Sequence, residues 1–390
     1  LVIFDVLAML FVAINFLKII YFKRNSTLNL FIALMLILVF YQITSGFILF
    51  QSSVYISYSN VIAVAFKYFI YSLMAFFITN YLISNDATKN NLDIWMRSSL
   101  VVAAIGVFQI FAINSVPFFS NYFLWENIRG GGHRIAATFR WQGVLVFYLC
   151  IMIPLVLGKL LDNENAIFKK KRNDVIVFLL ILMIGFYSGS RSVFIVFFST
   201  ALMFFLKPFI KNNFRISYRK VLALLFSIAP VYYFLNNFLL NSHAVRRVLG
   251  LEGAVGVTTG ISPRQRIIQA GIEAWERSPI MGIGTGNYSI STGLAAHNTY
   301  LEILVENGIL GLGIYIMILL LFSKIIISLF LVSINRKKMF PVSIAFSLVN
   351  ILIYQATASA IQYRLFWIYL PIVFSYHYIY YLDKKKSYCD

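Results

Sequence analysis

The stretch "HNTYLEILVENGILGLGIYIMILLLFSKIIISLFLV", residues 297–332, indicates the fold of the whole chain. It carries no charged residue from Asn307 to Ser323, and its apolar run is long enough to cross a bilayer core of about 30 Å as a helix. The apolar residues follow one another continuously, whereas a strand of a membrane barrel would alternate apolar and polar residues. We therefore predict a transmembrane helix over 301–333, long enough to tilt or to project beyond the bilayer.

The composition extends this prediction to the other segments. The chain has 390 residues, of which 60% are hydrophobic and 12% charged, whereas a soluble domain is about half apolar and a quarter charged. We predict an all-α polytopic membrane protein of about 11–12 transmembrane helices, forming one domain over 1–390. Eleven spans are placed near 1–22, 28–50, 60–84, 99–119, 142–161, 175–189, 192–210, 221–241, 301–333, 339–360 and 365–382.

The net charge of +19 is explained by the excess of Lys and Arg that membrane proteins carry in their cytoplasmic loops, and does not indicate binding to nucleic acid. Basic residues gather in short connections that alternate along the chain, and such connections stay in the cytoplasm. This pattern predicts a cytoplasmic C-terminus and an outward-facing residue 1. The connection 242–300 then lies at the outer face. It is too polar to span the bilayer and too long for a simple turn, and such loops are usually functional lids or caps. We expect this large loop, periplasmic if the membrane is a bacterial inner membrane, to carry part of the functional site.

The two cysteines and the ends of the chain give no evidence of a disulfide, a metal site or a cleavable signal peptide. Cys150 lies within a predicted span and Cys389 in the tail, so neither a disulfide nor a metal site is indicated. No cleavable signal peptide is evident, and because residue 1 is not Met we expect residues upstream of it.

The predicted outer connections contain arginine but no lysine. Arginine holds two oxygens at once with a planar, permanently charged fork, which suits a diphosphate. The topology rule counts both residue types together and does not explain this split. The ten arginines are Arg129, Arg134, Arg140, Arg191, Arg246, Arg247, Arg264, Arg266, Arg277 and Arg364.

Two outer segments place arginines beside small-residue turns. In "YSGSRSVF", 187–194, a tight turn brings Arg191 to the start of the next span. In "SPRQRIIQAGIEAWERSPIMGIGTGNY", 262–288, Ser262 and Pro263 predict a helix start with Arg264 in the first turn. This helix is expected to end near Arg277, to bury a side formed by Ile267, Ile268, Gly271, Ala274 and Trp275, and to be followed by a flexible glycine-rich turn.

The opening of the first stretch places polar side chains at the mouth of a span. His297 can accept a proton near neutral pH. Thr299 and Glu302 have the spacing of a capping box, so Glu302 can serve the helix start instead of chemistry. Glu306 lies about two turns in, where a carboxylate is costly, and an arginine partner is expected. Lys67, within another span, could pair with an acid such as Asp5 or extend to the interface.

Together these segments resemble the O-antigen polymerase and O-antigen ligase family of bacterial envelope proteins. The motifs are "SGSR", an arginine about fifteen residues before a proline and a glycine-rich turn, and "HNTYLEILVENGILGL" over 297–312. The resemblance covers roughly 175–330 and implies a fold like that of other multispan, lipid-linked-sugar glycosyltransferases (GT-C-like). It also implies a bacterial inner-membrane location and transfer of a glycan from a polyprenyl-diphosphate carrier to a glycan acceptor at the outer face.

The resemblance also implies roles for individual residues. Arg191 and Arg264 would hold the diphosphate with support from Arg266, and His297 would act at the acceptor hydroxyl. Glu306 would orient His297 or balance an arginine, and Asn298 and Arg134 would support the site. The outer loops offer only Glu126, Glu252, Glu273 and Glu276 as carboxylates, with no paired-aspartate motif, so we predict a metal-independent reaction without a cofactor.

Three alternatives stay open. A ligase would transfer the glycan to lipid A–core, but ligases often carry a second histidine before the HN pair, and this chain has "AAHN". A transporter of the same lipid-linked glycans would need midplane charges and internal repeats, which the sequence does not display. A non-catalytic assembly subunit would not need the HN motif. A chain-length regulator protein is a further candidate partner for a polymerase.

Overall fold

The computed structural model describes residues 3–15, 25–51, 57–115, 135–139, 141–162, 167, 171–211 and 263–386. These residues form helices and their connections, with no strand among them, which confirms the all-α prediction. Within these ranges six helices are long and apolar enough to cross a membrane. They are α2 (Ser26–Gln51), α3 (Tyr58–Ser84), α4 (Thr88–Ser115), α6 (Gln142–Asp162), α8 (Val193–Ile210) and α13 (Thr299–Arg336).

Further helices coincide with predicted spans but are shorter than the about 20 residues that a bilayer core requires. These are α1 (Ile3–Asn15), α7 (Lys171–Tyr187) and α14 (Phe340–Gln355), with 13, 17 and 16 residues. Helix α15 (Arg364–Lys386) covers the last predicted span. The predicted span 221–241 lies outside the described residues, so the number eleven stays a prediction.

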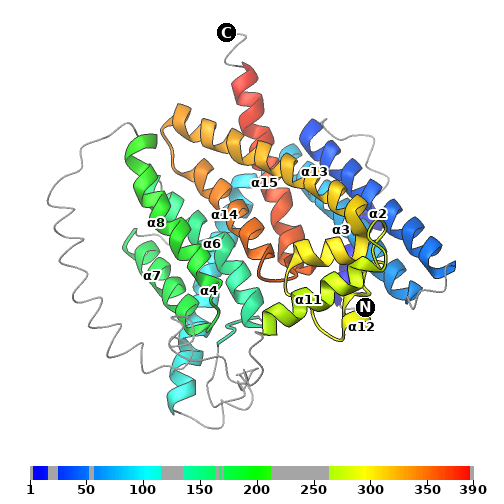
Figure 1. The fold of residues 1–390 in the computed structure, drawn as a ribbon. Coiled ribbons are helices and arrows are strands. Elements are labelled where there is room, and N and C mark those ends of the chain that lie inside the picture. The colour runs from blue at the N-terminus through cyan, green and yellow to red at the C-terminus, as the bar shows by residue number, and fades with distance from the viewer. Residues whose placement is uncertain are drawn as a thin grey trace. The chain divides into compact units, whose positions relative to one another are not determined.

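The chain divides into two compact units, whose helices are labelled in Figure 1. The first comprises Leu1–Leu92, Val257–Ile325 and Gln355–Asp390, and the second comprises Asp93–Gly256 and Ile326–Tyr354. The assignment of the whole chain to one transmembrane domain stays a prediction.

The first unit is held together by an aromatic cluster between helices far apart in the sequence. Helix α3 packs on α1, α2 and α15. The Phe31 ring of α2 lies 5.1 Å from the Phe374 ring of α15, and the Tyr71 ring of α3 lies 5.7 Å from the Trp367 ring. Aromatic pairs at such distances stabilise a core beyond the area that they bury.

The second unit is built around α6, which packs on α7 and α8 and is the most buried of the six candidate spans. Its polar interior is hydrogen-bonded: Asn350 donates to the Ser199 hydroxyl at 2.9 Å and to the Cys150 carbonyl at 3.2 Å. Asp162 accepts from the N–H groups of Met339 and Phe340, each at 2.7 Å, which caps the start of α14.

Candidate active site

His297 lies two residues before the first residue of α13. His297 is exposed and its backbone is left-handed, with φ of +48°. Histidine is one of the few residues besides glycine that are found there more often than average. The next residue, Asn298, accepts hydrogen bonds at its Oδ1 from the N–H groups of Tyr300 at 2.9 Å and Leu301 at 3.1 Å. The HN pair is therefore an exposed histidine directly before a capped helix start.

The capping box predicted for Thr299 and Glu302 is wrong, because the preceding asparagine takes the cap. The Thr299 hydroxyl instead donates to the Ala358 carbonyl at 2.8 Å and accepts from the Ala360 N–H at 2.9 Å. The Glu302 carboxylate accepts a hydrogen bond from the Gln362 amide at 2.6 Å. The first turn of α13 is thus fastened to the segment 358–362, which includes the 3₁₀-helix η3 (Ala360–Gln362).

The transmembrane helix predicted over 301–333 is present as α13, but it is broken at Gly308. This residue has φ of +63° and ψ of −167°, a conformation essentially restricted to glycine. A break leaves carbonyl groups before it and N–H groups after it without helical partners. At membrane depth such groups require other partners within the protein.

The glycine-rich segment after α11 (Pro263–Glu276) supplies these partners. The glycine-rich turn predicted after α11 is present. It was expected to be flexible, but backbone hydrogen bonds attach it to α13 on both sides of the break. Four backbone hydrogen bonds join the two segments. They run from Ile283 N–H to Val305 O at 2.9 Å, Gly284 N–H to Glu306 O at 2.9 Å, Ile309 N–H to Pro279 O at 3.0 Å, and Leu310 N–H to Ile280 O at 3.4 Å. The Tyr41 hydroxyl of α2 donates to the Asn307 carbonyl at 2.9 Å.

Two glycines make this close approach feasible. A Cβ atom on Gly308 would lie 2.2 Å from the Ile280 carbonyl oxygen, and one on Gly282 would lie 2.4 Å from the Glu306 carbonyl carbon. Gly282 also has a positive φ, of +75°. Gly308 therefore brings a loop backbone, and not a second helix, against α13.

The buried Glu306 carboxylate also binds the loop that follows α11, through backbone N–H groups. Its side chain is buried, and Oε1 accepts a hydrogen bond from the Tyr288 N–H at 3.0 Å. Within the described ranges its hydrogen-bonding partners are this N–H and that of Gly286, and not the expected arginine. Glu306 therefore connects α13 to the start of α12 (Tyr288–Thr292).

Tyr288 joins this arrangement to α11. Its hydroxyl donates to the Ile267 carbonyl at 2.8 Å, and a Cβ atom on Gly271 would meet that hydroxyl at 2.8 Å. Burial raises the pKa of Tyr288 to about 12, and the negative charges of Glu302 and Glu306 add to this rise. The phenol therefore stays protonated at neutral pH and keeps its donor role.

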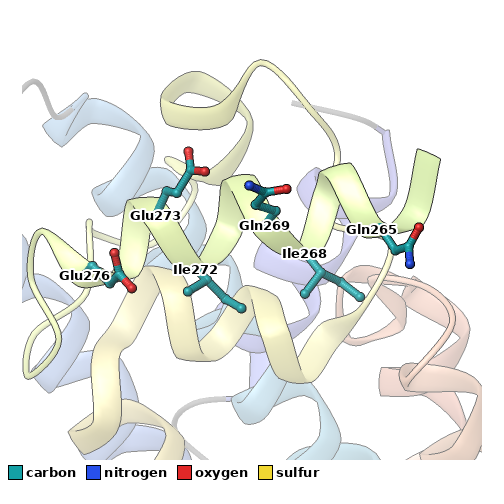
Figure 2. A pocket seen from close by; sticks show the side chains of 6 residues that line it. All are labelled: Gln265, Ile268, Gln269, Ile272, Glu273 and Glu276. Atoms are coloured by element: carbon teal, nitrogen blue, oxygen red, sulfur yellow. The ribbon is translucent and has the colours of Figure 1, made fainter. Parts of the chain in front are cut away.

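Helix α11 starts at Pro263 and ends one residue before Arg277, close to its predicted limits. Ala274 packs in a small core with Ile283, Tyr288, Ala296 and Val305. Ile268 was expected on this buried side but is 45% exposed, and it lines a pocket on the other side of the helix. Figure 2 shows the six side chains of that pocket, all from α11: Gln265, Ile268, Gln269, Ile272, Glu273 and Glu276. Arg264 and Arg266 are exposed in the first turn of the helix.

The O-antigen ligase family model matches residues 176–316. This part of the chain is an O-antigen ligase family domain. The domain contains both the broken α13 and the glycine-rich loop fastened to it. It also includes Arg191, Arg264, Arg266 and the HN pair. No curated protein matches the chain.

The domain begins in the second unit and ends in the first. Arg191 is exposed in the turn between α7 and α8, where its carbonyl accepts from the Phe194 N–H at 3.2 Å. It belongs to the second unit, whereas Arg264, Arg266 and His297 belong to the first. Arg134 lies outside the described residues and outside the O-antigen ligase domain.

Across the described part of the chain, no three His, Cys, Asp or Glu side chains gather as a metal site would require.

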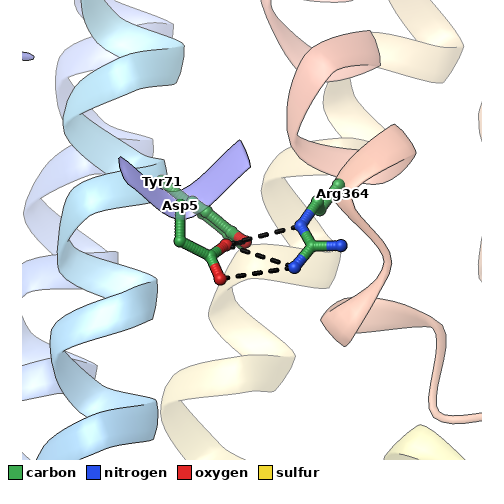
Figure 3. Close-up of polar contacts among 3 residues, drawn as sticks. All are labelled: Asp5, Tyr71 and Arg364. Carbon is green, nitrogen blue, oxygen red and sulfur yellow. Dashed lines mark hydrogen bonds and ion pairs between the residues drawn. The ribbon is translucent and has the colours of Figure 1, made fainter. Parts of the chain in front are cut away.

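Arg364, one of the predicted outer arginines, already has an internal anion. Its guanidinium contacts the Asp5 carboxylate of α1 at 3.3 and 3.4 Å, and the Tyr71 hydroxyl donates to the same carboxylate at 2.5 Å (Figure 3). The ion pair of Asp5 is with Arg364, and Lys67 instead places its Nζ 5.7 Å from the centre of the Tyr71 ring. Asp5 thus fastens α1 to both α3 and α15.

Replacing Asp5 by Asn is expected to lower the free energy of unfolding by about 1–2 kcal/mol, because Arg364 loses a charged acceptor. Partial exposure of the Arg364 side chain, 35%, keeps the effect at this modest level. Thermal unfolding in detergent measures the change. Asp86→Asn is the matched control, since Asp86 is exposed in a turn with φ of +48° that asparagine also adopts. Equal melting temperatures for both variants would contradict the assigned role.

Three residues that contact this site were not predicted from the sequence: Gln362, Tyr41 and Tyr288. The Gln362 amide and the Tyr41 hydroxyl reach the site from helices 60 and 266 residues away in sequence. Tyr288 follows the glycine-rich turn directly. Those glycines were the available signal, because repeated glycine often marks a close approach of two backbones.

Proposed function

We propose that this protein is an O-antigen or surface-polysaccharide polymerase. It transfers a glycan from a polyprenyl-diphosphate carrier to a hydroxyl of another lipid-linked glycan, at the outer face of the bacterial inner membrane. The observation that carries the proposal is the position of His297, inside the O-antigen ligase family domain. It is an exposed residue at the mouth of a broken, apolar helix. Broken helices at membrane depth commonly line substrate sites.

The proposed reaction is one displacement at the anomeric carbon. The acceptor hydroxyl forms the new C–O bond and gives its proton to the His297 imidazole. The bond from the anomeric carbon to the diphosphate oxygen breaks, and polyprenyl diphosphate leaves with that electron pair. Attack opposite to the leaving group inverts the anomeric centre.

Negative charge that builds on the diphosphate must meet fixed positive charge. Arg264 and Arg266 are exposed in the first turn of α11, where free backbone N–H groups also favour an anion. Arg191 is the third proposed ligand, with Arg134 in support. Because permanently charged guanidinium groups supply the positive charge, the reaction is proposed to proceed without a metal ion or cofactor.

Glu306 and Asn298 act in this proposal through the backbone. Asn298 caps the helix directly after His297, and Glu306 holds the loop that follows α11. The Glu306 side chain is buried, so in this proposal it does not contact the acceptor. Its hydrogen bond from the Tyr288 N–H instead holds the loop that links the arginine-bearing α11 to the segment with His297.

The alternative is a ligase that transfers the same glycan to lipid A–core. The family description favours it, because it is that of an O-antigen ligase. The sequence before His297 favours the polymerase, because it is "AAHN" and lacks the second histidine often found in ligases. The two activities share a donor and differ only in the acceptor.

Replacing Arg264 by Lys is expected to lower the transfer rate by about 10²–10³-fold, as removal of one preorganised donor at a developing negative charge does. Lysine keeps the charge but loses the fork that binds two oxygens. The assay uses purified protein and one polyprenyl-diphosphate oligosaccharide. Arg277→Lys, an exposed arginine just after the same helix, is the matched control and is expected to retain activity. Full turnover by Arg264→Lys would remove the diphosphate grip from this proposal.

A further inference from the structure

The Thr299 side chain is fully buried two residues after the exposed His297. Threonine at the start of a helix usually caps it, but Asn298 already accepts the N–H groups that a cap would serve. The Thr299 hydroxyl is therefore available for contacts away from its own helix.

The hydroxyl uses both of its hydrogen-bonding capacities on one other segment. It donates to the Ala358 carbonyl at 2.8 Å and accepts from the Ala360 N–H at 2.9 Å. These backbone groups lie about sixty residues later, in the connection before α15. A hydroxyl that donates and accepts at once is fixed in rotation as well as in position.

This attachment acts where a helix is least ordered. Helix ends fray, and the residue before the cap has no helical hydrogen bond of its own. His297 is also left-handed, so its side chain direction depends on the backbone at Asn298 and Thr299 remaining in place. Glu302, bonded to Gln362, fastens the helix to the same segment one turn further in.

We propose that Thr299 is a positioning residue for His297: its two hydrogen bonds to residues 358–360 hold the helix start so that the imidazole points at the acceptor hydroxyl. This inference rests on the proposed function, in which His297 takes the proton. Thr299 itself touches neither substrate. It acts on the chemical step, and the binding of the donor is left to the arginines.

The test compares Thr299→Val, Thr299→Ser and wild type with purified protein and one polyprenyl-diphosphate oligosaccharide. Valine keeps the shape and loses both hydrogen bonds, whereas serine keeps both. We expect Thr299→Val to lower kcat by about 10–100-fold, the loss that a misplacement of about 1 Å causes, with KM for the donor nearly unchanged. Thr299→Ser is expected to retain wild-type kcat.

Two further measurements separate positioning from a general loss of stability. Thr79→Val removes another fully buried threonine hydroxyl of the same unit, bonded to the Ala75 carbonyl at 2.7 Å, and is expected to leave kcat unchanged. Thr299→Val added to His297→Ala is expected to lower the residual rate no further, because Thr299 acts through His297.

Wild-type kcat in Thr299→Val would overturn the inference. Should the valine variant not give monodisperse protein, Thr299→Ala loses the same bonds without a misplaced methyl group, and full activity there overturns it equally. In either case loss of activity in His297→Ala would leave the proposed function standing. Absence of transfer by the wild type would instead count against the proposed function itself.

Discussion

Replacing His297 by Ala is expected to lower the rate of glycan transfer by about 10²–10⁴-fold, the usual contribution of a general base. The acceptor hydroxyl must lose a proton as it attacks. His297 is an exposed group at the start of α13 with a basic nitrogen that can take this proton. Because its side chain is exposed, the variant should still fold.

The left-handed backbone of His297 requires a second variant. Alanine is unfavourable at φ of +48°, so part of its effect could come from the backbone. Asparagine adopts this conformation readily but has no basic nitrogen. His297→Asn should therefore be as inactive as His297→Ala. Ser289→Ala, at an exposed position of α12, is the control for a neutral substitution on the same loop. Near wild-type turnover in His297→Asn would exclude the histidine from the chemistry.

Replacing Gly308 by Ala is expected to destabilise the protein strongly. The backbone conformation alone costs about 1–3 kcal/mol for a residue with a Cβ atom. The new atom would also lie 2.2 Å from the Ile280 carbonyl oxygen, which belongs to a hydrogen-bonded backbone and cannot move aside easily. We expect a lower melting temperature in detergent and loss of transfer, because the loop after α11 separates from the break.

Gly313→Ala is the matched control for this substitution. Gly313 lies five residues later in the helical part of α13, and a Cβ atom there would meet nothing within 4 Å. Alanine favours a helix over glycine by up to about 1 kcal/mol, so this variant should melt at the same temperature or slightly higher. Equal behaviour of Gly308→Ala and Gly313→Ala would mean that α13 is not broken in the native protein.

Much of the fold could be predicted because hydropathy and local signals act over short distances. The apolar run after Asn307 predicted α13, and Pro263 predicted the first residue of α11. The break at Gly308 could not be predicted, since a glycine in an apolar helix is equally suited to close packing of a second helix. The structure distinguishes the two by placing the loop 279–284 against it.

The partners of the polar residues were harder to predict than the residues themselves. The sequence alone marks His297, Glu302 and Glu306 as unusual at a membrane boundary. Their partners depend on tertiary contacts, and Glu302 meets Gln362 while Glu306 meets a backbone N–H. Asp5 pairs with Arg364, 359 residues away in the sequence, and not with the nearer cation Lys67. A single sequence contains no information on which distant segments meet.

The most direct test of the proposed function uses the wild-type protein, purified in nanodiscs, with one polyprenyl-diphosphate oligosaccharide and EDTA. The products are separated by size, and a second reaction contains lipid A–core. We predict a ladder of longer lipid-linked glycans in the presence of EDTA, lost in His297→Asn. Transfer only to lipid A–core would make the protein a ligase. A ladder that EDTA abolishes would contradict the metal-independent mechanism, and no transfer to either acceptor by folded protein would contradict the proposed function.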